Sequence, residues 1–156
     1  MATTPSVHPP LQSTRRPVQK AALAVGVVFA AVGVLGFVPG VTTNYADLAV
    51  AGHESEAMLL GIFQVSVLHN IVHLVFGVIG IAVSRRPEAS LTYLLAGGIV
   101  YLVLWAYGLL VDHQSDANFV PLNAADDWLH LGLGLGMIAL GLLTTRRHAR
   151  RSATRR

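Results

Sequence analysis

Four long stretches without a single charged side chain divide this chain, and they constrain its fold more than any other feature. The stretches cover residues 21–46, 57–84, 89–111 and 128–145. A helix needs about 20 predominantly apolar residues to cross the roughly 30 Å hydrocarbon core of a membrane. Each stretch can hold one such helix, so the sequence predicts four transmembrane helices.

The composition supports this prediction over a soluble fold. Only 12% of the residues are charged, whereas a soluble domain carries about 25%. A soluble four-helix bundle would also show a charged stripe on each helix, and none of the four stretches has one. We therefore expect an all-α polytopic membrane protein with a four-helix bundle over residues 21–145. A disordered tail over residues 1–20 and an Arg-rich tail over residues 146–156 would flank it.

The basic residues predict the orientation. All eleven Lys and Arg side chains fall in three segments: before the first stretch, between the second and third, and after the fourth. All the acidic residues except Glu88 fall in the two opposite loops. Because cytoplasmic loops are rich in Lys and Arg, both termini are expected in the cytoplasm. Arg15 and Arg16 also resemble a twin-arginine export signal, but the apolar stretch that follows exceeds the 7 to 15 residues of a signal core.

This placement of the basic residues makes the lipid bilayer the expected partner, and no nucleic acid is expected. The absence of cysteine excludes disulfides, thiolate metal sites, iron–sulfur clusters and cysteine nucleophiles. The sequence identifies no catalytic residue, and we favour a non-enzymatic protein.

Small residues recur at helical spacing and predict close helix packing. The first stretch places Ala22, Gly26, Phe29, Gly33, Gly36 and Gly40 on one side, and the second adds Gly77 and Gly80. Gly132 and Gly136 form a G-x-x-x-G pair in the fourth stretch. Such faces also suit self-association or the docking of a membrane partner.

Polar side chains gather on single faces of two stretches. At 100° per residue, the second stretch places Ser66, His69, Asn70, His73, Gly77 and Gly80 within one arc. The fourth places Asn123, Asp126, Asp127, His130, Gly134, Met137 and Gly141 within a similar arc. The third presents Tyr101, Trp105, Gly108 and Asp112 as a stripe. Because polar groups are costly against lipid, we expect an interior cluster in the outer leaflet: His69, Asn70, His73, Trp105, Asp112, Asp126, Asp127 and His130.

Three segments resemble a family of small bacterial membrane proteins. They read Phe37-Val38-Pro39-Gly40, then Gly61-Ile62-Phe63-Gln64-Val65-Ser66-Val67-Leu68-His69-Asn70-Ile71-Val72-His73-Leu74, then Phe119-Val120-Pro121-Leu122-Asn123 leading to Asp127-Trp128-Leu129-His130-Leu131-Gly132. The family is the domain of unknown function 4383, and the resemblance extends from about Gly36 to Gly141. It implies four spans and a bacterial cytoplasmic membrane. It implies no activity, cofactor or substrate.

Three interpretations of the polar cluster stay open. The first is a structural latch, in which Asp126 or Asp127 pairs with His73 or His130 and fixes the second helix against the fourth. The second is a transition-metal site on His69, His73, His130 and Asp126, or a haem b held between His73 and His130. The third is an outward-facing pH or metal sensor, because histidine titrates near pH 6.5.

Overall fold

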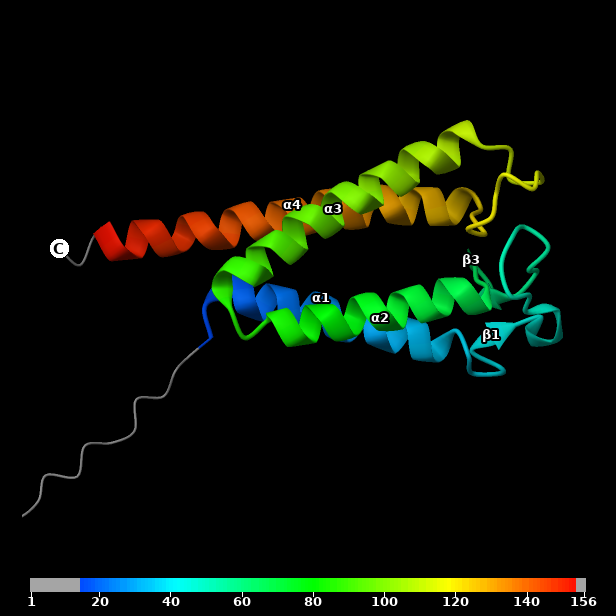
Figure 1. Cartoon of the computed structure of the whole chain (residues 1–156), viewed down its shortest axis with the longest axis horizontal. Coiled ribbons are helices and arrows are strands. Elements are labelled where there is room, and N and C mark those ends of the chain that lie inside the picture. The colour runs from blue at the N-terminus through cyan, green and yellow to red at the C-terminus, as the bar shows by residue number, and fades with distance from the viewer. Residues whose placement is uncertain (1–14, 154–156) are drawn as a thin grey trace, which may run out of the picture.

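Two helical hairpins make up most of the structure (Figure 1). The first joins α1 (Pro17–Leu35) to α2 (Val67–Val83), and the second joins α3 (Pro87–Leu110) to α4 (Ala124–Ala153). Helices α1 and α2 pack mainly on each other, as do α3 and α4, and fewer contacts join the two hairpins. The hairpins converge where α2 turns into α3 and diverge toward the opposite end (Figure 1).

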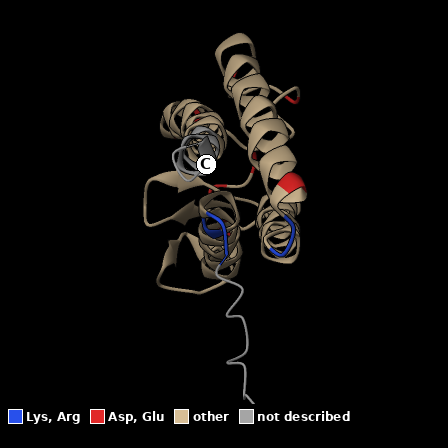
Figure 2. Ribbon diagram, turned by 90° about the vertical axis from the view of Figure 1, so that its left-hand side faces the viewer, with Lys and Arg blue, Asp and Glu red and all other residues tan. Residues whose placement is uncertain are grey.

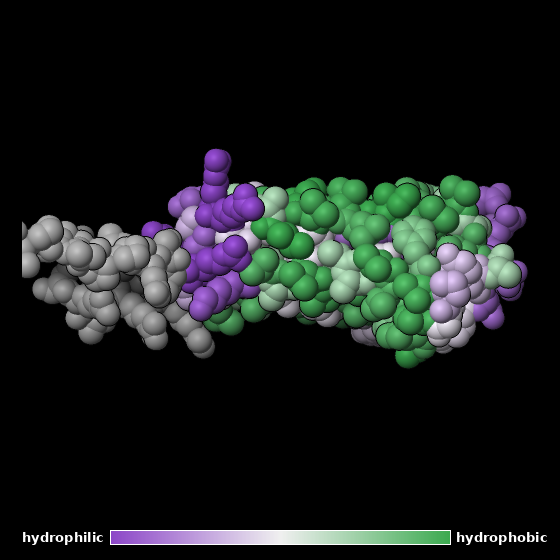
Figure 3. Space-filling view, turned by 90° about the horizontal axis from the view of Figure 1, so that it is seen from below, coloured by the Kyte–Doolittle hydropathy of each residue, from purple (hydrophilic) through white to green (hydrophobic). Residues whose placement is uncertain are grey.

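The computed structural model describes residues 15–153, and it describes side chains as far as residue 145. Within this part of the chain, α1, α3 and residues 124–145 of α4 are long and apolar enough to cross a membrane. Helix α2 is apolar but has only 17 residues. On the face shown in Figure 3, hydrophobic residues cover the middle of the molecule and hydrophilic residues lie at its two ends. These apolar helices indicate a lipid bilayer environment.

The helix boundaries follow from local sequence. Pro17 and Pro87 occupy the first turns of α1 and α3, where a missing N–H costs nothing. The side chain of Gln19 ties two helix ends together: its Oε1 accepts the N–H of Arg16 at 2.9 Å, and its Nε2 donates to the carbonyl of Ser84 at 3.0 Å. The start of α1 is thereby bonded to the end of α2.

A small antiparallel sheet covers the far end of the first hairpin, and the all-α expectation missed it. Its strands are β1 (Thr42–Thr43), β2 (Met58–Leu59) and β3 (Phe63–Gln64), in the order β1-β2-β3. The uncharged stretches at residues 21–46 and 57–84 are therefore helical only in part. Uncharged residues there form loops and strands that cover the helix ends, and a count of charges cannot separate these from a span.

The expected tail boundaries also shift. Helix α1 already begins at Pro17, inside the expected tail over residues 1–20, and α4 continues to Ala153, well beyond residue 145. Residues 1–14 and 154–156 lie outside the described part of the chain. The Lys and Arg residues whose side chains are described belong to the start of α1 and to the α2–α3 connection (Figure 2). The backbone of the Arg-rich segment extends α4 toward the same end (Figure 1).

The glycines of α1 and α2 lie where the two backbones touch. A Cβ atom added to Gly26 would come within 2.7 Å of the backbone nitrogen of Ile81 and 2.8 Å of the carbonyl oxygen of Gly77. Added Cβ atoms at Gly33, Gly36, Gly77 and Gly80 would also collide with the facing helix or with side chains. Gly36 closes α1 as its C-cap, and Gly40 lies beyond the helix in a turn with φ of +89°.

The pair Gly132 and Gly136 behaves differently from the expectation of close packing. A Cβ atom at either position would meet nothing within 4 Å, so these glycines do not pack closely on another helix in the described part of the chain. The packing glycine of α4 is Gly134, whose added Cβ would lie 2.7 Å from Leu102 and 3.0 Å from the carbonyl oxygen of Gly98. A G-x-x-x-G spacing marks a face but cannot say which helix, if any, covers it.

Candidate functional site

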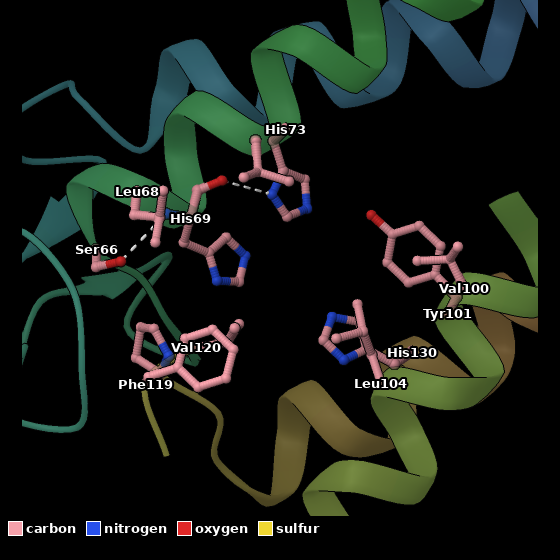
Figure 4. A pocket seen from close by; sticks show the side chains of 12 residues that line it. Ser66, Leu68, His69, His73, Val100, Tyr101, Leu104, Phe119, Val120 and His130 are labelled. Atoms are coloured by element: carbon pink, nitrogen blue, oxygen red, sulfur yellow. Dashed lines mark hydrogen bonds between the residues drawn. The ribbon is translucent and has the colours of Figure 1, made fainter. Parts of the chain in front are cut away.

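A cavity of about 280 Å³ opens between the two hairpins, in the half of the molecule nearer the sheet (Figure 4). We call it the histidine pocket. Three imidazoles from two helices border it: His69 and His73 on α2, and His130 on α4. The rest of its wall is Ser66, Leu68, Val72, Val100, Tyr101, Leu104, Phe119, Val120 and Pro121. Three polar rings thus share an otherwise largely apolar cavity.

The first turn of α2 sets the position of two of the imidazoles. Ser66 is the N-cap, and its Oγ accepts the N–H of His69 at 3.1 Å. The i, i+4 spacing then stacks His73 on His69, with ring centroids 4.5 Å apart and planes only 1° from parallel. The Nδ1 of His73 lies 3.0 Å from the carbonyl oxygen of His69. Because a carbonyl only accepts, Nδ1 must carry the proton, and Nε2 of a neutral His73 is a hydrogen-bond acceptor.

The third imidazole comes from the other hairpin. The ring of His130 packs on Tyr101 of α3, with 5.2 Å between the ring centroids. Tyr101 stacks on Phe29 of α1, with 5.3 Å between their ring centroids. Phe29 also lies 5.4 Å from the ring of His73. These aromatic contacts connect all four helices and hold Tyr101 and His130 opposite His73. The hydroxyl of Tyr101 points into the space between His73 and His130 (Figure 4).

Two of the ring nitrogens at the pocket are buried and lack partners. His69, His73 and His130 are 9%, 9% and 3% exposed. The Nδ1 atoms of His69 and His130 are enclosed and have no hydrogen-bond partner within the described part of the chain. A buried polar group left without a partner costs about 1–3 kcal/mol. The pocket therefore concentrates unused hydrogen-bonding capacity in an apolar surrounding.

The two aspartates of α4 do not pair with these histidines, contrary to the latch interpretation. The Oδ2 of Asp126 accepts the backbone N–H groups of Gln64 and Asn123, both at 3.0 Å. The Oδ2 of Asp127 lies 3.2 Å from Nε2 of His113, in the α3–α4 connection. Each carboxylate thus has a partner other than the imidazoles of the pocket, and the Oδ1 of Asp127 is buried without a hydrogen-bond partner in the described part of the chain. Both lie at the start of α4, where the helix dipole favours negative charge.

The remaining members of the expected cluster also lie elsewhere. The carboxamide of Asn70 packs against Gly36 at the end of α1, where an added Cβ would collide with it. Asp112 follows the end of α3 and is exposed, and its Oδ1 accepts the N–H of Gln114. Trp105 is partly buried with an unpartnered Nε1, but it does not line the histidine pocket. Residues that share one face of a helix, and were expected in one cluster, therefore make separate contacts.

Sequence reasoning left some pocket residues out of the cluster. Tyr101 was placed on the stripe of the third helix, but its place between Phe29 and His130 depends on the crossing of the hairpins. Phe119, Val120 and Pro121 enter the wall from the α3–α4 connection, which no helical periodicity describes. His113, the partner of Asp127, sits next to Asp112 in the same connection, and its spacing carries no signal.

The geometry also bears on the metal interpretation. Among the residues the structure describes, no group of three or more His, Asp or Glu side chains is arranged to hold a metal ion. Asp126, the expected fourth ligand, directs its carboxylate to backbone N–H groups instead. His69, His73 and His130 all line one cavity, but they are not arranged as a set of metal ligands.

Apolar helices arranged as two hairpins, with a histidine-lined cavity between them, define a membrane-type helical bundle. The model of the family described as Domain of unknown function (DUF4383) matches residues 19–143 of the chain. The chain therefore belongs to the DUF4383 family. No curated protein and no solved structure matches it.

Proposed function

We propose that this protein crosses the membrane four times and binds a small, uncharged, largely apolar ligand in the histidine pocket. One observation carries the proposal: the imidazoles of His69, His73 and His130, from two hairpins, border one cavity with an otherwise largely apolar wall. Two of them, His69 and His130, have a buried Nδ1 without a hydrogen-bond partner in the described part of the chain. Ligand sites are typically apolar clefts with a few convergent polar groups. A purely structural cluster would pair these nitrogens with each other or with nearby acids.

The membrane part of this proposal rests on charge and hydropathy. The basic residues gather at one end of the hairpins and the acidic loops at the other. With the basic end inside, both termini are cytoplasmic and the histidine pocket lies in the outer leaflet of a bacterial cytoplasmic membrane. The short α2 fits this arrangement because the sheet, which precedes α2 in the chain, extends the first hairpin beyond the start of α2.

A structural latch is part of the proposal, with partners other than the histidines. Asp126 binds the backbone of Gln64, and the Nδ2 of Asn123 donates to the carbonyl of Ile62 at 2.9 Å. These bonds fasten the start of α4 to the sheet of the first hairpin. They join the two hairpins at this end and leave the imidazoles free for a ligand.

The test is the content of the purified protein. Wild type, His73→Phe and His130→Phe would be purified from native membranes in a mild detergent, extracted with organic solvent and analysed by mass spectrometry. His53→Gln, which removes an imidazole from the loop after β1, is the matched control. We expect one small molecule at near-stoichiometric level in wild type and control, and a reduction of at least tenfold in both pocket variants.

Two results would contradict the proposal. One is equal content of every extracted molecule in wild type and in folded pocket variants. The other is empty wild-type protein whose melting temperature does not rise when the total membrane extract is added back, because a ligand that binds only the folded state must stabilise it.

A further inference from the structure

The charges around the histidine pocket restrict the class of ligand. None of its twelve wall residues is Lys, Arg, Asp or Glu. Within residues 15–153, the Lys and Arg residues belong to the opposite end of the hairpins. The carboxylates of Asp126 and Asp127, at the start of α4, contact backbone N–H groups and His113 and are not part of the wall. A phosphate headgroup or the carboxylates of a haem would enter without a counter-charge, which is costly in an apolar site.

The hydrogen-bonding groups of the wall come in complementary kinds. His73 offers an acceptor at Nε2, because its Nδ1 proton is used by the carbonyl of His69. Tyr101 offers a hydroxyl that faces the same space (Figure 4). The Nδ1 of His130 has no hydrogen-bond partner in the described part of the chain, so this atom can donate or accept, depending on the tautomer. Carbonyl and hydroxyl oxygens on a neutral ligand would satisfy all three.

The size of the pocket fits one ring. A cavity of about 150 Å³ holds a benzene molecule, so about 280 Å³ accommodates a single substituted ring and is small for a macrocycle. Its wall carries aromatic surfaces from His69, Tyr101 and Phe119, and flat rings pack on such surfaces.

The mouth of the pocket faces the apolar exterior. Leu68, Val72, Val100 and Phe119 line the cavity and are also 40%, 54%, 52% and 57% exposed. They belong to the hydrophobic surface of the bundle, which lipid would cover. A ligand held by its ring could extend a hydrocarbon tail through this opening into the bilayer.

We infer that the histidine pocket binds the head group of a lipid-soluble quinone or its quinol, with the tail leaving between α2 and α3. This inference rests on the proposed function and names its ligand class. Ring oxygens accept from Tyr101 and His130 as a quinone, and a quinol hydroxyl donates to Nε2 of His73. The pocket thus has a partner for either form.

The experiment measures binding of decylubiquinone and decylubiquinol to the full chain in detergent, from the rise in melting temperature as the probe is titrated. Decylbenzene, which has a ring and tail but no oxygen, and haemin are the comparison probes. We expect saturable stabilisation by decylubiquinone and decylubiquinol only. The apparent affinity should fall at least tenfold in His73→Phe and in Tyr101→Phe, and less in His73→Gln. Val78→Ala, on the outer face of α2, should bind like wild type.

Equal stabilisation by decylbenzene and decylubiquinone would overturn the inference, as would unchanged affinity in folded His73→Phe and Tyr101→Phe. A Soret band from haemin that is lost in His73→Phe would replace the quinone with a haem. If decylubiquinone does not bind but the content of a co-purified molecule still falls in His73→Phe, the ligand class is wrong and the proposed function is kept. If decylubiquinone does not bind and no co-purified molecule depends on His73, the proposed function is wrong as well.

Discussion

Asp126 binds the backbone of Gln64, 62 residues earlier in the chain, with 3.0 Å between its Oδ2 and the Gln64 nitrogen. The same oxygen accepts the N–H of Asn123 at the start of α4. Asn123 in turn caps the helix, because its Oδ1 accepts the N–H of Ala125 and Asp126. The capping arrangement of α4 thus also holds the sheet of the other hairpin. Asp126, in the first turn of α4, therefore also contributes to the contact between the two hairpins.

Replacing Asp126 with Ala should loosen this junction. Two backbone N–H groups lose their acceptor, so we expect a loss of about 1–3 kcal/mol in the free energy of unfolding. The melting temperature in detergent measures this loss, and faster hydrogen exchange at the Gln64 amide would locate it. Asp116→Ala, in the exposed part of the α3–α4 connection, should leave both unchanged. Equal effects of the two substitutions would contradict the role assigned to Asp126.

Gly26 lies against the backbone of α2, whereas Gly132 faces open space. Gly26→Ala places a methyl group against the backbone of α2, and we expect a loss of about 1–3 kcal/mol because backbone cannot move aside cheaply. Gly132→Ala meets open space and should be neutral, or stabilising by up to about 1 kcal/mol from helix propensity. Melting temperatures of the two variants check this order. A destabilising Gly132→Ala would mean that another molecule packs there.

Much of the bundle follows from periodicity. The arc that holds His69, His73 and Gly77 on the second stretch is the buried face of α2, because a 3.6-residue repeat fixes which side chains share a side. The partners of that arc cannot be read this way. Asp126 bonds to a backbone N–H, which leaves no trace in the identity of the residue at position 64. Tyr101 reaches the pocket through the crossing of two hairpins, which depends on side-chain packing across the whole core.

Asn118 should stabilise the α3–α4 connection, although it belongs to no sequence motif. It is fully buried in the α3–α4 connection. Its Nδ2 donates to the carbonyls of His113 and Leu122, and its Oδ1 accepts the N–H of Leu122. These three bonds shape the segment that supplies Phe119 and two other residues to the pocket wall.

We expect Asn118→Ala to cost about 2–3 kcal/mol, since three bonds are lost in a buried position. Limited proteolysis should cut the connection faster, because its backbone would open locally. Gln114→Ala changes an exposed side chain of the same connection and should have no effect on either measurement. Unchanged proteolysis of folded Asn118→Ala would show that the connection is held by other contacts.

The orientation can be tested cleanly because the chain has no cysteine. Asp116→Cys and Glu88→Cys each replace an exposed acidic residue, one in the α3–α4 connection and one at the start of α3. A membrane-impermeant maleimide added to intact cells should label Cys at position 116 and should label Cys at position 88 only after permeabilisation, because Arg85 and Arg86 next to Glu88 favour the cytoplasmic side. The reverse pattern would invert the protein and place the histidine pocket in the inner leaflet. Labelling of both positions in intact cells would contradict a membrane crossing by α3.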